Sequence, residues 1–257
     1  KIAVRSIDYD DVYFQPGAGM GESRHTFLEK NNLPERFRAP TDGHFRISEL
    51  GFGGGLNFLL TAELWEKTAP PDARLTYVGI EKHPLTPGDL KRLHAFWPGL
   101  RPYAEALQER YPPRLEGFHS LHFLENRITL RLLYGDVTDV LTEIKGTFDA
   151  WYLDGFAPAK NPAMWENRIF SLIAARTAEG GTLATYSSAG SVRRGLQAAG
   201  FTVEKTDGYG VKRDMTVARL TSGPPQKKSC AEKITVLGAG IAGASVAFAL
   251  ARKGFSV

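Results

Sequence analysis

The fold class of this 257-residue chain is decided by the segment Glu49-Leu50-Gly51-Phe52-Gly53-Gly54-Gly55. It follows a short apolar segment, 45–48, and precedes a helix-like segment, 56–60. Glycine allows positive φ and lets the backbone approach a ligand that a Cβ would block. The amides at the start of the following helix add a favourable partial positive charge. This order predicts a nucleotide-cradling turn, although a turn that merely connects a strand to a helix has the same composition.

The spacing of the glycines is Glu-x-Gly-x-Gly-x-Gly, with the acid two residues ahead of the first glycine. This variant suits S-adenosylmethionine better than a dinucleotide, because S-adenosylmethionine has no pyrophosphate and its methionyl ammonium is a cation. We therefore predict that S-adenosylmethionine is bound by Glu49, Gly51, Gly53 and Gly55.

The composition is that of a soluble globular protein, with 42% hydrophobic and 23% charged residues. No apolar run approaches the roughly 18 residues that a membrane helix needs. The single cysteine, Cys230, excludes an internal disulfide and is typical of a reducing compartment. A net charge of +4 allows a polyanionic partner without requiring one. We expect a cytoplasmic monomer that has no membrane segment.

After the glycine turn, strand-like and helix-like segments alternate, which predicts a mostly parallel sheet. The expected strands are 45–48, 75–80, 128–134, 148–153, 181–186, 201–205 and 215–220. The last two follow each other without a helix between them, and so predict an antiparallel hairpin. A Rossmann-like α/β fold with a seven-stranded sheet of this kind is typical of class I S-adenosylmethionine-dependent methyltransferases.

Acidic residues stand at the ends of the next three strands, where open α/β sheets bind their ligands. Glu81 is placed to accept hydrogen bonds from a ribose diol, although a surface carboxylate beside Lys82 would look the same. Asp136 is placed to accept a hydrogen bond from an adenine amino group. Asp154 follows the fourth strand, beside the expected position of the reactive methyl group.

The segment from Asp154 to Trp165 presents a carboxylate, the ring of Phe156 and an amide within a few residues. Methylation of an amine needs a neutral nitrogen, whereas an alkylamine with a pKa of about 10.4 is mostly protonated at neutral pH. We predict that Asp154 orients the amine and takes its proton, and that Phe156 shapes the pocket. The alternative is that Asp154 only caps the following turn.

A second glycine motif lies near the C-terminus, where Gly238, Gly240 and Gly243 follow an apolar segment. Gly-x-Gly-x-x-Gly between a strand and a helix predicts the start of an FAD-binding domain. Some 25 residues cannot bury a core, so we expect this domain to be truncated. The predicted organisation is a methyltransferase domain over 1–220, a linker over 221–232 that is rich in Gly, Pro, Ser and Lys, and the first strand and helix of the FAD-binding domain over 233–257.

Together these motifs make the chain resemble the methyltransferase part of the MnmC family, bifunctional enzymes that complete 5-methylaminomethyl-2-thiouridine at the tRNA wobble position. The resemblance is carried by residues 10–14, 21–24, 51–59, 81–86, 154–165, 188–196 and 210–215. It implies a tRNA substrate whose 5-aminomethyl-2-thiouridine amine is methylated. It also implies an FAD-dependent domain that first removes a carboxymethyl group, an activity not expected from this chain alone.

The resemblance also implies roles for residues outside the strand ends. Tyr13, Glu22 and Ser23 are expected to fold over the cofactor, and Asn57 and Val137 to join its site. For the substrate, the expected contacts are made by Lys160, Asn161, Arg193, Arg194, Lys212 and Arg213. Basic residues that meet tRNA phosphates add salt-dependent affinity, but basic pairs are usually just solvated.

The long segment 82–126 has two interpretations, because it interleaves Phe96, Trp97, Tyr103 and Tyr111 with arginines. Such residues can stack on bases and neutralise phosphates, or they can form an extra helical layer with its own small core. The motif His119-x-x-His122 has no evident third ligand, so a packing role is expected and no metal.

Three other functions remain open at this point. A small-molecule amine methyltransferase would use the same pocket without depending on tRNA or salt. A flavoprotein could use its methyltransferase-like part only to dock tRNA, and would then not bind S-adenosylmethionine here. A non-catalytic RNA-binding module with a vestigial pocket would have no need for the glycine turn, Glu81 and Asp136.

Overall fold

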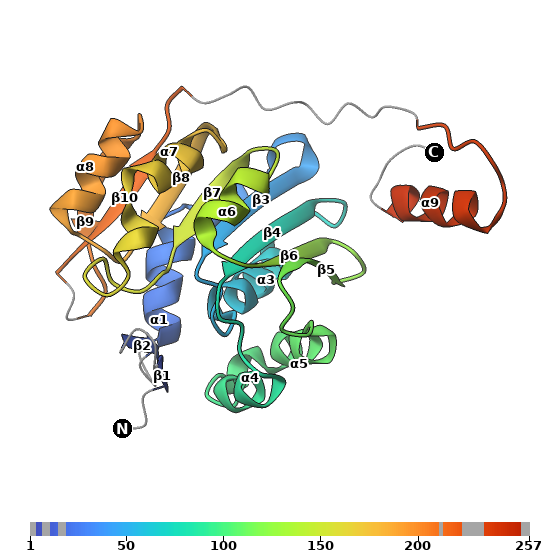
Figure 1. Cartoon of the computed structure of the whole chain (residues 1–257), viewed down its shortest axis with the longest axis horizontal. Helices are drawn as coiled ribbons and strands as arrows, with labels where there is room; N and C mark the ends of the chain where they lie inside the picture. The colour runs from blue at the N-terminus through green and yellow to red at the C-terminus, as the bar shows by residue number, and fades with distance from the viewer. Residues whose placement is uncertain (1–3, 7–10, 15–18, 211–212, 223–233, 253–257) are drawn as a thin grey trace.

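The computed structural model describes residues 4–6, 11–14, 19–210, 213–222 and 234–252, and its centre is an eight-stranded sheet with the order β5-β6-β4-β3-β7-β8-β10-β9 (Figure 1). Strands β6, β4, β3, β7 and β8 are parallel, whereas β5, β10 and β9 pair antiparallel. The strands of this sheet are β3 (His44–Leu50), β4 (Arg74–Glu81), β5 (Gly117–Phe123), β6 (Ile128–Tyr134), β7 (Phe148–Leu153), β8 (Thr177–Thr185), β9 (Thr202–Asp207) and β10 (Asp214–Arg219).

The predicted fold class is confirmed, since each of the seven expected segments forms a strand and the last two form the antiparallel hairpin. Strand β5 is an addition to the prediction. It pairs with β6 alone, at the edge of the sheet, and several of its side chains are partly or fully exposed. An edge strand with one neighbour needs no continuous apolar run, so its sequence, Gly-Phe-His-Ser-Leu-His-Phe, gives a weak strand signal.

Helices cover both faces of the sheet. On one face, the buried residues of the helices belong to the same hydrophobic cluster as Tyr77 and Tyr152. On the other face, they belong to the cluster that contains Trp151. The first layer contains η1, a π-helix (Arg24–Glu29), α2 (Leu33–Arg36), α3 (Leu56–Thr68), α4 (Pro87–His94), η3 (Pro98–Leu100) and α5 (Arg101–Arg110). The second contains α6 (Val137–Glu143), α7 (Asn167–Ala174) and α8 (Gly190–Ala198). The remaining short helices of the main body are α1 (Gly19–Ser23), η2 (Thr41–Gly43) and η4 (Pro162–Trp165).

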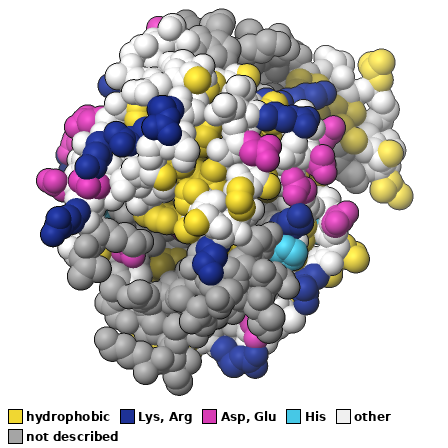
Figure 2. Space-filling model, turned by 60° about the vertical axis from the view of Figure 1, so that its left-hand side comes forward, with side chains coloured by type: hydrophobic (Ala, Val, Ile, Leu, Met, Phe, Trp, Pro, Cys, Tyr) yellow, Lys and Arg dark blue, Asp and Glu magenta, His cyan; other side chains and the backbone are white. Residues whose placement is uncertain are grey.

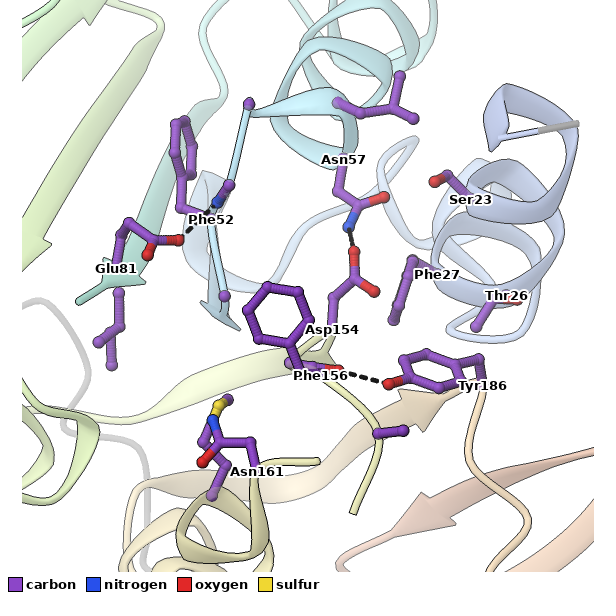
Figure 3. A pocket seen from close by; sticks show the side chains of 18 of the residues that line it. Ser23, Thr26, Phe27, Phe52, Asn57, Glu81, Asp154, Phe156, Asn161 and Tyr186 are labelled. Atoms are coloured by element: carbon purple, nitrogen blue, oxygen red, sulfur yellow. Dashed lines mark hydrogen bonds between the residues drawn. The ribbon is translucent and has the colours of Figure 1, made fainter. Parts of the chain in front are cut away.

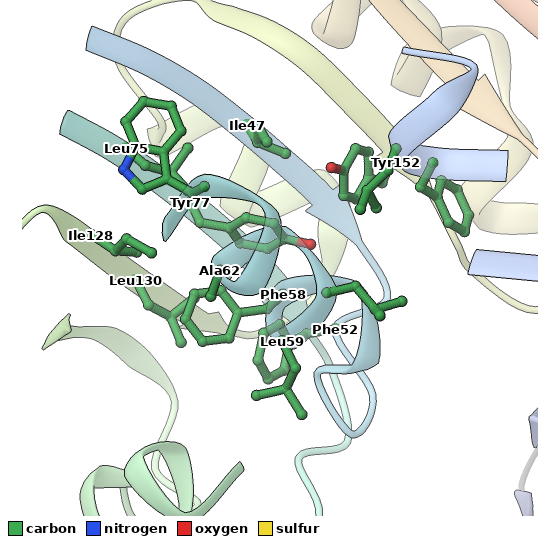
Figure 4. Packing of buried hydrophobic residues seen from close by; sticks show 14 of the residues in the cluster. Ile47, Phe52, Phe58, Leu59, Ala62, Leu75, Tyr77, Ile128, Leu130 and Tyr152 are labelled. Carbon is green, nitrogen blue, oxygen red and sulfur yellow. The ribbon is translucent and has the colours of Figure 1, made fainter. Parts of the chain in front are cut away.

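Strand β7 is the element that both layers bury, and all six of its residues are buried. Its neighbouring residues Trp151 and Tyr152 point to opposite faces, as strand pleating requires. On the α3 face, the rings of Phe58 and Tyr77 meet edge-on with centroids 5.3 Å apart, and Tyr77 lies 5.9 Å from Tyr152 (Figure 4). This packing fixes the carboxyl end of β7 between β3 and β8.

The segment α1–η1 connects the first helical layer to the terminal hairpin. Arg24 Nη2 lies 2.5 Å from Glu63 Oε2 on α3. On the other side, His25 Nε2 lies 3.1 Å from the Asp207 carbonyl and Lys30 Nζ lies 3.0 Å from Thr206 Oγ1. The segment therefore spans the space above the strand ends. It is preceded by a two-stranded antiparallel pair, β1 (Val4–Ser6) and β2 (Asp11–Phe14).

The C-terminal motif forms a turn and a helix, α9 (Ile241–Arg252), which lies apart from the sheet in Figure 1. A Cβ on Gly243 would lie 1.8 Å from the Gly238 carbonyl oxygen, so the turn needs glycine there. The strand expected before it does not form within residues 234–240, where no neighbouring strand pairs with it. The domain boundaries and the FAD assignment stay predictions, and Cys230 lies outside the described residues. Within the part of the chain that is described, every helix is too short or too polar to cross a bilayer.

Candidate active site

A cavity of about 730 Å³ opens where the parallel strands of the sheet end. Its walls come from the segments that follow β3, β4, β6, β7 and β8, and it is covered by α1, η1 and the β9–β10 loop. This volume lies within the ~300–1,000 Å³ that small-molecule sites span. The structure thus brings the predicted strand ends together around one space.

The glycine turn after β3 is held against its neighbours by backbone contacts. The N–H groups of Gly51 and Phe52 both donate to the Ile80 carbonyl, each over 3.0 Å. Gly51 has φ +87°, and a Cβ there would lie 2.6 Å from the Asp154 carbonyl oxygen. Only glycine therefore lets the turn and the end of β7 approach this closely.

A buried histidine supports the same turn from the α4 side. His94 Nε2 lies 2.9 Å from the Gly54 carbonyl, and Gln108 Nε2 lies 2.9 Å from His94 Nδ1. Burial lowers the pKa of His94, so the imidazole is neutral, with Nε2 donating and Nδ1 accepting. No sequence signal predicts this role, because His94 lies in the long segment 82–126, for which two interpretations are possible.

The Glu81 carboxylate, at the end of β4, is oriented by two backbone groups. Gly53 N–H donates to Oε2 over 2.8 Å and His83 N–H donates to Oε1 over 2.7 Å. An ionised carboxylate has about four acceptor positions. These two donors fix Glu81 beside the glycine turn and leave acceptor capacity for a diol, and its contact with a ribose stays a prediction.

Asp136 caps the helix that follows β6. Its Oδ1 accepts from Thr138 N–H over 2.9 Å, and its Oδ2 lies 3.0 Å from Lys82 Nζ. Partial burial raises the pKa of Asp136, but the Thr138 N–H and the Lys82 charge outweigh this and lower it overall. Asp136 is thus ionised in the cavity wall, next to Val137, which also lines the cavity.

The most buried part of the site is a chain of hydrogen bonds that ends at Asp154. Asn57 Nδ2 donates to Asp154 Oδ2 over 2.7 Å (Figure 3). The same Nδ2 also donates to Glu49 Oε1 over 2.7 Å. Glu49 Oε2 accepts from the Tyr77 hydroxyl over 2.8 Å. Glu49 is 1% exposed, and burial, reinforced by the negative charge of Asp154, raises its pKa well above the usual range.

Glu49, for which a contact with the cofactor is predicted, does not line the cavity. It lies behind Asn57. The reason is strand pleating, because Glu49 shares a face of β3 with Phe45 and Ile47, which pack in the layer of α3. Asn57, in contrast, lines the cavity as predicted.

The segment after β7 is held in place by hydrogen bonds to the backbone carbonyls of two consecutive residues. The Tyr186 hydroxyl donates to the Gly155 carbonyl, and Trp165 Nε1 donates to the Phe156 carbonyl over 2.9 Å. Figure 3 shows the Phe156 ring beside Asp154. These bonds hold the predicted pair of a carboxylate and an aromatic ring in the cavity wall.

The other predicted site residues divide into those near the cavity and those away from it. Glu22, Ser23 and Asn161 line it. Lys160, Arg193 and Arg194 do not, and Arg213 is exposed directly before β10. Tyr13 belongs to β2 but its side chain lies outside the described part, as does Lys212 altogether. Wall residues that the sequence did not single out as site residues include Thr26, Phe27, His83, Trp97, Tyr186 and Tyr209.

The segment 82–126 forms the extra helical layer rather than an open stacking surface. Trp97 is 3% exposed and Tyr103 and Tyr111 pack on the same core, whereas Phe96 is 42% exposed. Several of the arginines are paired with acids of the same helices: Arg92 with Asp89, Arg101 with Glu105 and Arg110 with Glu109. In β5, His119 Nε2 lies 2.8 Å from the Leu115 carbonyl and His122 Nδ1 lies 3.3 Å from Thr129 Oγ1. Among the described residues, no three His, Cys, Asp or Glu side chains cluster as metal ligands would.

The chemistry of the wall fits S-adenosylmethionine. The wall contains four acids, Glu22, Glu81, Asp136 and Asp154, and two basic residues, Lys82 and His83. This excess of acids suits a ligand with two cationic groups. Asn57 Oδ1 is buried without a hydrogen-bond partner among the described residues, and so can accept from an ammonium group. Figure 3 shows this oxygen turned away from Asp154, to the side of Ser23.

Comparison with known proteins agrees with this chemistry. Residues 98–221 match the family model described as S-adenosyl-L-methionine-dependent methyltransferase. The chain is 43% identical, over 97% of its length, to the tRNA 5-methylaminomethyl-2-thiouridine biosynthesis bifunctional protein MnmC of Hahella chejuensis, of which it covers 40%. The protein of the same name from Ectopseudomonas mendocina is 45% identical over 98% of the chain and 40% of that protein.

A solved structure is similar as well. The crystal structure of MNMC2 from Aquifex aeolicus superposes with a TM-score of 0.65, with 31% identity, over 84% of this chain and 66% of that one. The chain spans about two fifths of the length of the curated relatives that it matches.

Proposed function

The chain belongs to the S-adenosyl-L-methionine-dependent methyltransferases, in the branch of the MnmC proteins, and from this premise we propose that it methylates a tRNA wobble uridine. The methyl group would pass from S-adenosylmethionine to the primary amine of 5-aminomethyl-2-thiouridine. The observation that carries the proposal is the carboxylate of Asp154, held by Asn57 in the cavity wall beside Phe156.

Glu81 would hold the ribose diol, Asp136 and Val137 the adenine, and Asn57 Oδ1 the methionyl ammonium. Bound S-adenosylmethionine supplies an electrophilic methyl group on a sulfonium. The protein must present an unprotonated amine to it, although such an amine is mostly protonated at neutral pH.

Asp154 supplies that condition in our proposal. Its carboxylate accepts a proton of the incoming ammonium, and the Asn57 amide stays bonded to Oδ2 and keeps the carboxylate in place. Phe156 excludes water from this side of the wall, which strengthens the interaction between charge and carboxylate. Much of the rate would then come from holding the amine in position.

In the whole protein we propose that an FAD-dependent step first removes a carboxymethyl group and so produces this primary amine. The turn formed by Gly238, Gly240 and Gly243 would begin the FAD-binding domain. Phosphate contacts are assigned to Arg193, Arg194, Lys212 and Arg213. On the face shown in Figure 2, the lysine and arginine side chains of the described residues are interspersed with acids around an apolar centre and do not form a continuous basic stripe.

The test begins with titration calorimetry of this chain with S-adenosylmethionine. Transfer of labelled methyl to tRNA carrying 5-aminomethyl-2-thiouridine follows, for the wild type and for Asp154→Asn. We expect the variant to bind cofactor within a few-fold of the wild type and to lose about 10²–10⁴-fold in turnover, the usual contribution of a positioned acid–base group. Asp139→Asn, an exposed acid on α6, is the matched control.

Three results would contradict the proposal. Absence of cofactor binding would leave only docking of tRNA. Unchanged turnover of Asp154→Asn would remove its role. Equal methylation of small amines and of tRNA, without dependence on salt, would identify a small-molecule methyltransferase instead.

A further inference from the structure

Two carboxyl groups in this molecule share one amide, and only one of them reaches the cavity. Asn57 Nδ2 donates to Glu49 Oε1 and to Asp154 Oδ2, and each bond is 2.7 Å, so the two oxygens lie within 5.4 Å of each other. Glu49 is 1% exposed and outside the cavity wall, whereas Asp154 lines it. The proposed chemistry uses Asp154 and leaves Glu49 without a role.

The surroundings of Glu49 disfavour a second charge. It is faced by Tyr77 from β4, Tyr152 from β7, Asn57 from α3, and the carboxylates of Asp154 and Glu81. None of these groups is a cation. Two like charges that share one site do not both ionise readily, and the more buried group keeps the proton.

We propose that Glu49 is a positioning residue that acts on Asp154 through Asn57, and that the pair carries one proton, held on Glu49. The single negative charge of the pair then stands at Asp154, on the side where the amine arrives. The role of Glu49 in catalysis rests on the proposed function. The assignment of the proton to Glu49 does not depend on that function.

The hydrogen-bond geometry is compatible with a neutral Glu49. Its Oε1 accepts from Asn57, and its Oε2 lies 2.8 Å from the Tyr77 hydroxyl. That hydroxyl donates to an ionised Glu49 and can instead accept from a protonated one. Burial and the Asp154 charge, which raise the pKa of Glu49, act in the same direction. A glutamine in this place would keep one acceptor for Asn57 and one donor for Tyr77.

The first experiment is infrared difference spectroscopy of the chain at neutral pH, without cofactor or tRNA. We expect the carbonyl stretch of one protonated carboxylic acid in the wild type, lost in Glu49→Gln. Glu105→Gln, an exposed acid paired with Arg101 over 2.7 Å, should lose no such band. If the spectra of the wild type and of Glu49→Gln show the same protonated-acid bands, the proposal is overturned.

The second experiment tests the action on Asp154 by methyl transfer across pH. Glu49→Gln should keep kcat within about 3-fold and the acid limb of the profile within about half a unit, because it replaces a neutral group by a neutral one. Glu49→Leu, which leaves Asn57 without this acceptor, should lower kcat by roughly 10-fold or more. If the acid limb of the Glu49→Gln pH profile lies a unit or more below that of the wild type, Glu49 is ionised in the wild type. Equal kcat in both variants would remove its positioning role.

Discussion

The close approach of Gly51 to the end of β7 can be tested by adding one methyl group. In Gly51→Ala the new Cβ would lie 2.6 Å from the Asp154 carbonyl oxygen and 3.2 Å from Gly155 Cα. Gly43 is a matched control, because it also has a left-handed backbone, with φ +67° against +87°, but no atom within 4 Å of an added Cβ. The difference between the two variants isolates the close approach from the backbone preference.

The magnitudes follow from the two effects. A left-handed backbone costs an alanine about 1–2 kcal/mol, partly offset by the lower entropy of its unfolded chain. We expect Gly43→Ala to lower the free energy of unfolding by about 1 kcal/mol. In Gly51→Ala the neighbours are backbone atoms that must move apart by several tenths of an ångström, at a further cost of about 1–3 kcal/mol.

The consequence for function should exceed the consequence for stability. The displaced group is Asp154 itself, and a misplacement of about 1 Å at a reacting centre can cost about 10²-fold in rate. Urea unfolding measures the first effect, and calorimetry with S-adenosylmethionine followed by methyl transfer to tRNA measures the second. Equal destabilisation of the two variants, together with unchanged cofactor affinity and turnover of Gly51→Ala, would contradict this prediction.

Two other changes test the site and the sheet. Replacing Glu81 by alanine removes a charged acceptor, so calorimetry should find S-adenosylmethionine affinity about 10–100-fold lower, by about 1.5–3 kcal/mol; an unchanged affinity would exclude the ribose role. Burial, reinforced by the charges of Arg46 and two further arginines, lowers the pKa of His44 from 6.5 to about 4. The unfolded chain therefore takes up this proton first as the pH falls, and stability is lost between pH 6.5 and about 4, by about 3 kcal/mol in all. In urea unfolding, His44→Gln should lose less stability than the wild type over this range, and an equal loss in the two proteins would contradict the prediction.

The sequence predicts the central strands well because their burial is nearly complete. Strand β7 is buried at all six positions, and apart from Asp149 its residues are apolar up to Asp154. Parallel pairing then brings the ends of β3, β4, β6 and β7 to one edge without further information. The glycine turn, Glu81, Asp136 and Asp154 were therefore predictable as neighbours.

The covering of the cavity was less predictable, since it depends on contacts between distant parts of the chain. Phe27 and Tyr209 line it because α1–η1 lies between α3 and the terminal hairpin. No local spacing encodes these contacts. The buried position of Glu49, in contrast, could be predicted from the alternation of side chains along a strand. Glu49 follows Phe45 and Ile47 at intervals of two residues, so its side chain lies on the buried face of the sheet that packs against α3.

The pKa values of Asp136 and Glu49 shift in opposite directions because the two carboxyl groups differ in donors and in burial. Asp136 receives a backbone N–H and Lys82, and its pKa is lowered although burial opposes this. Glu81 receives two backbone N–H groups at the glycine turn. Glu49 receives only a shared amide and a tyrosine hydroxyl, in full burial, and its pKa is raised. The donors to Asp136 lie at the strand ends that form the cavity, so its negative charge lies where a cationic ligand would bind. Glu49 lies behind Asn57, where the raised pKa favours the neutral carboxyl group.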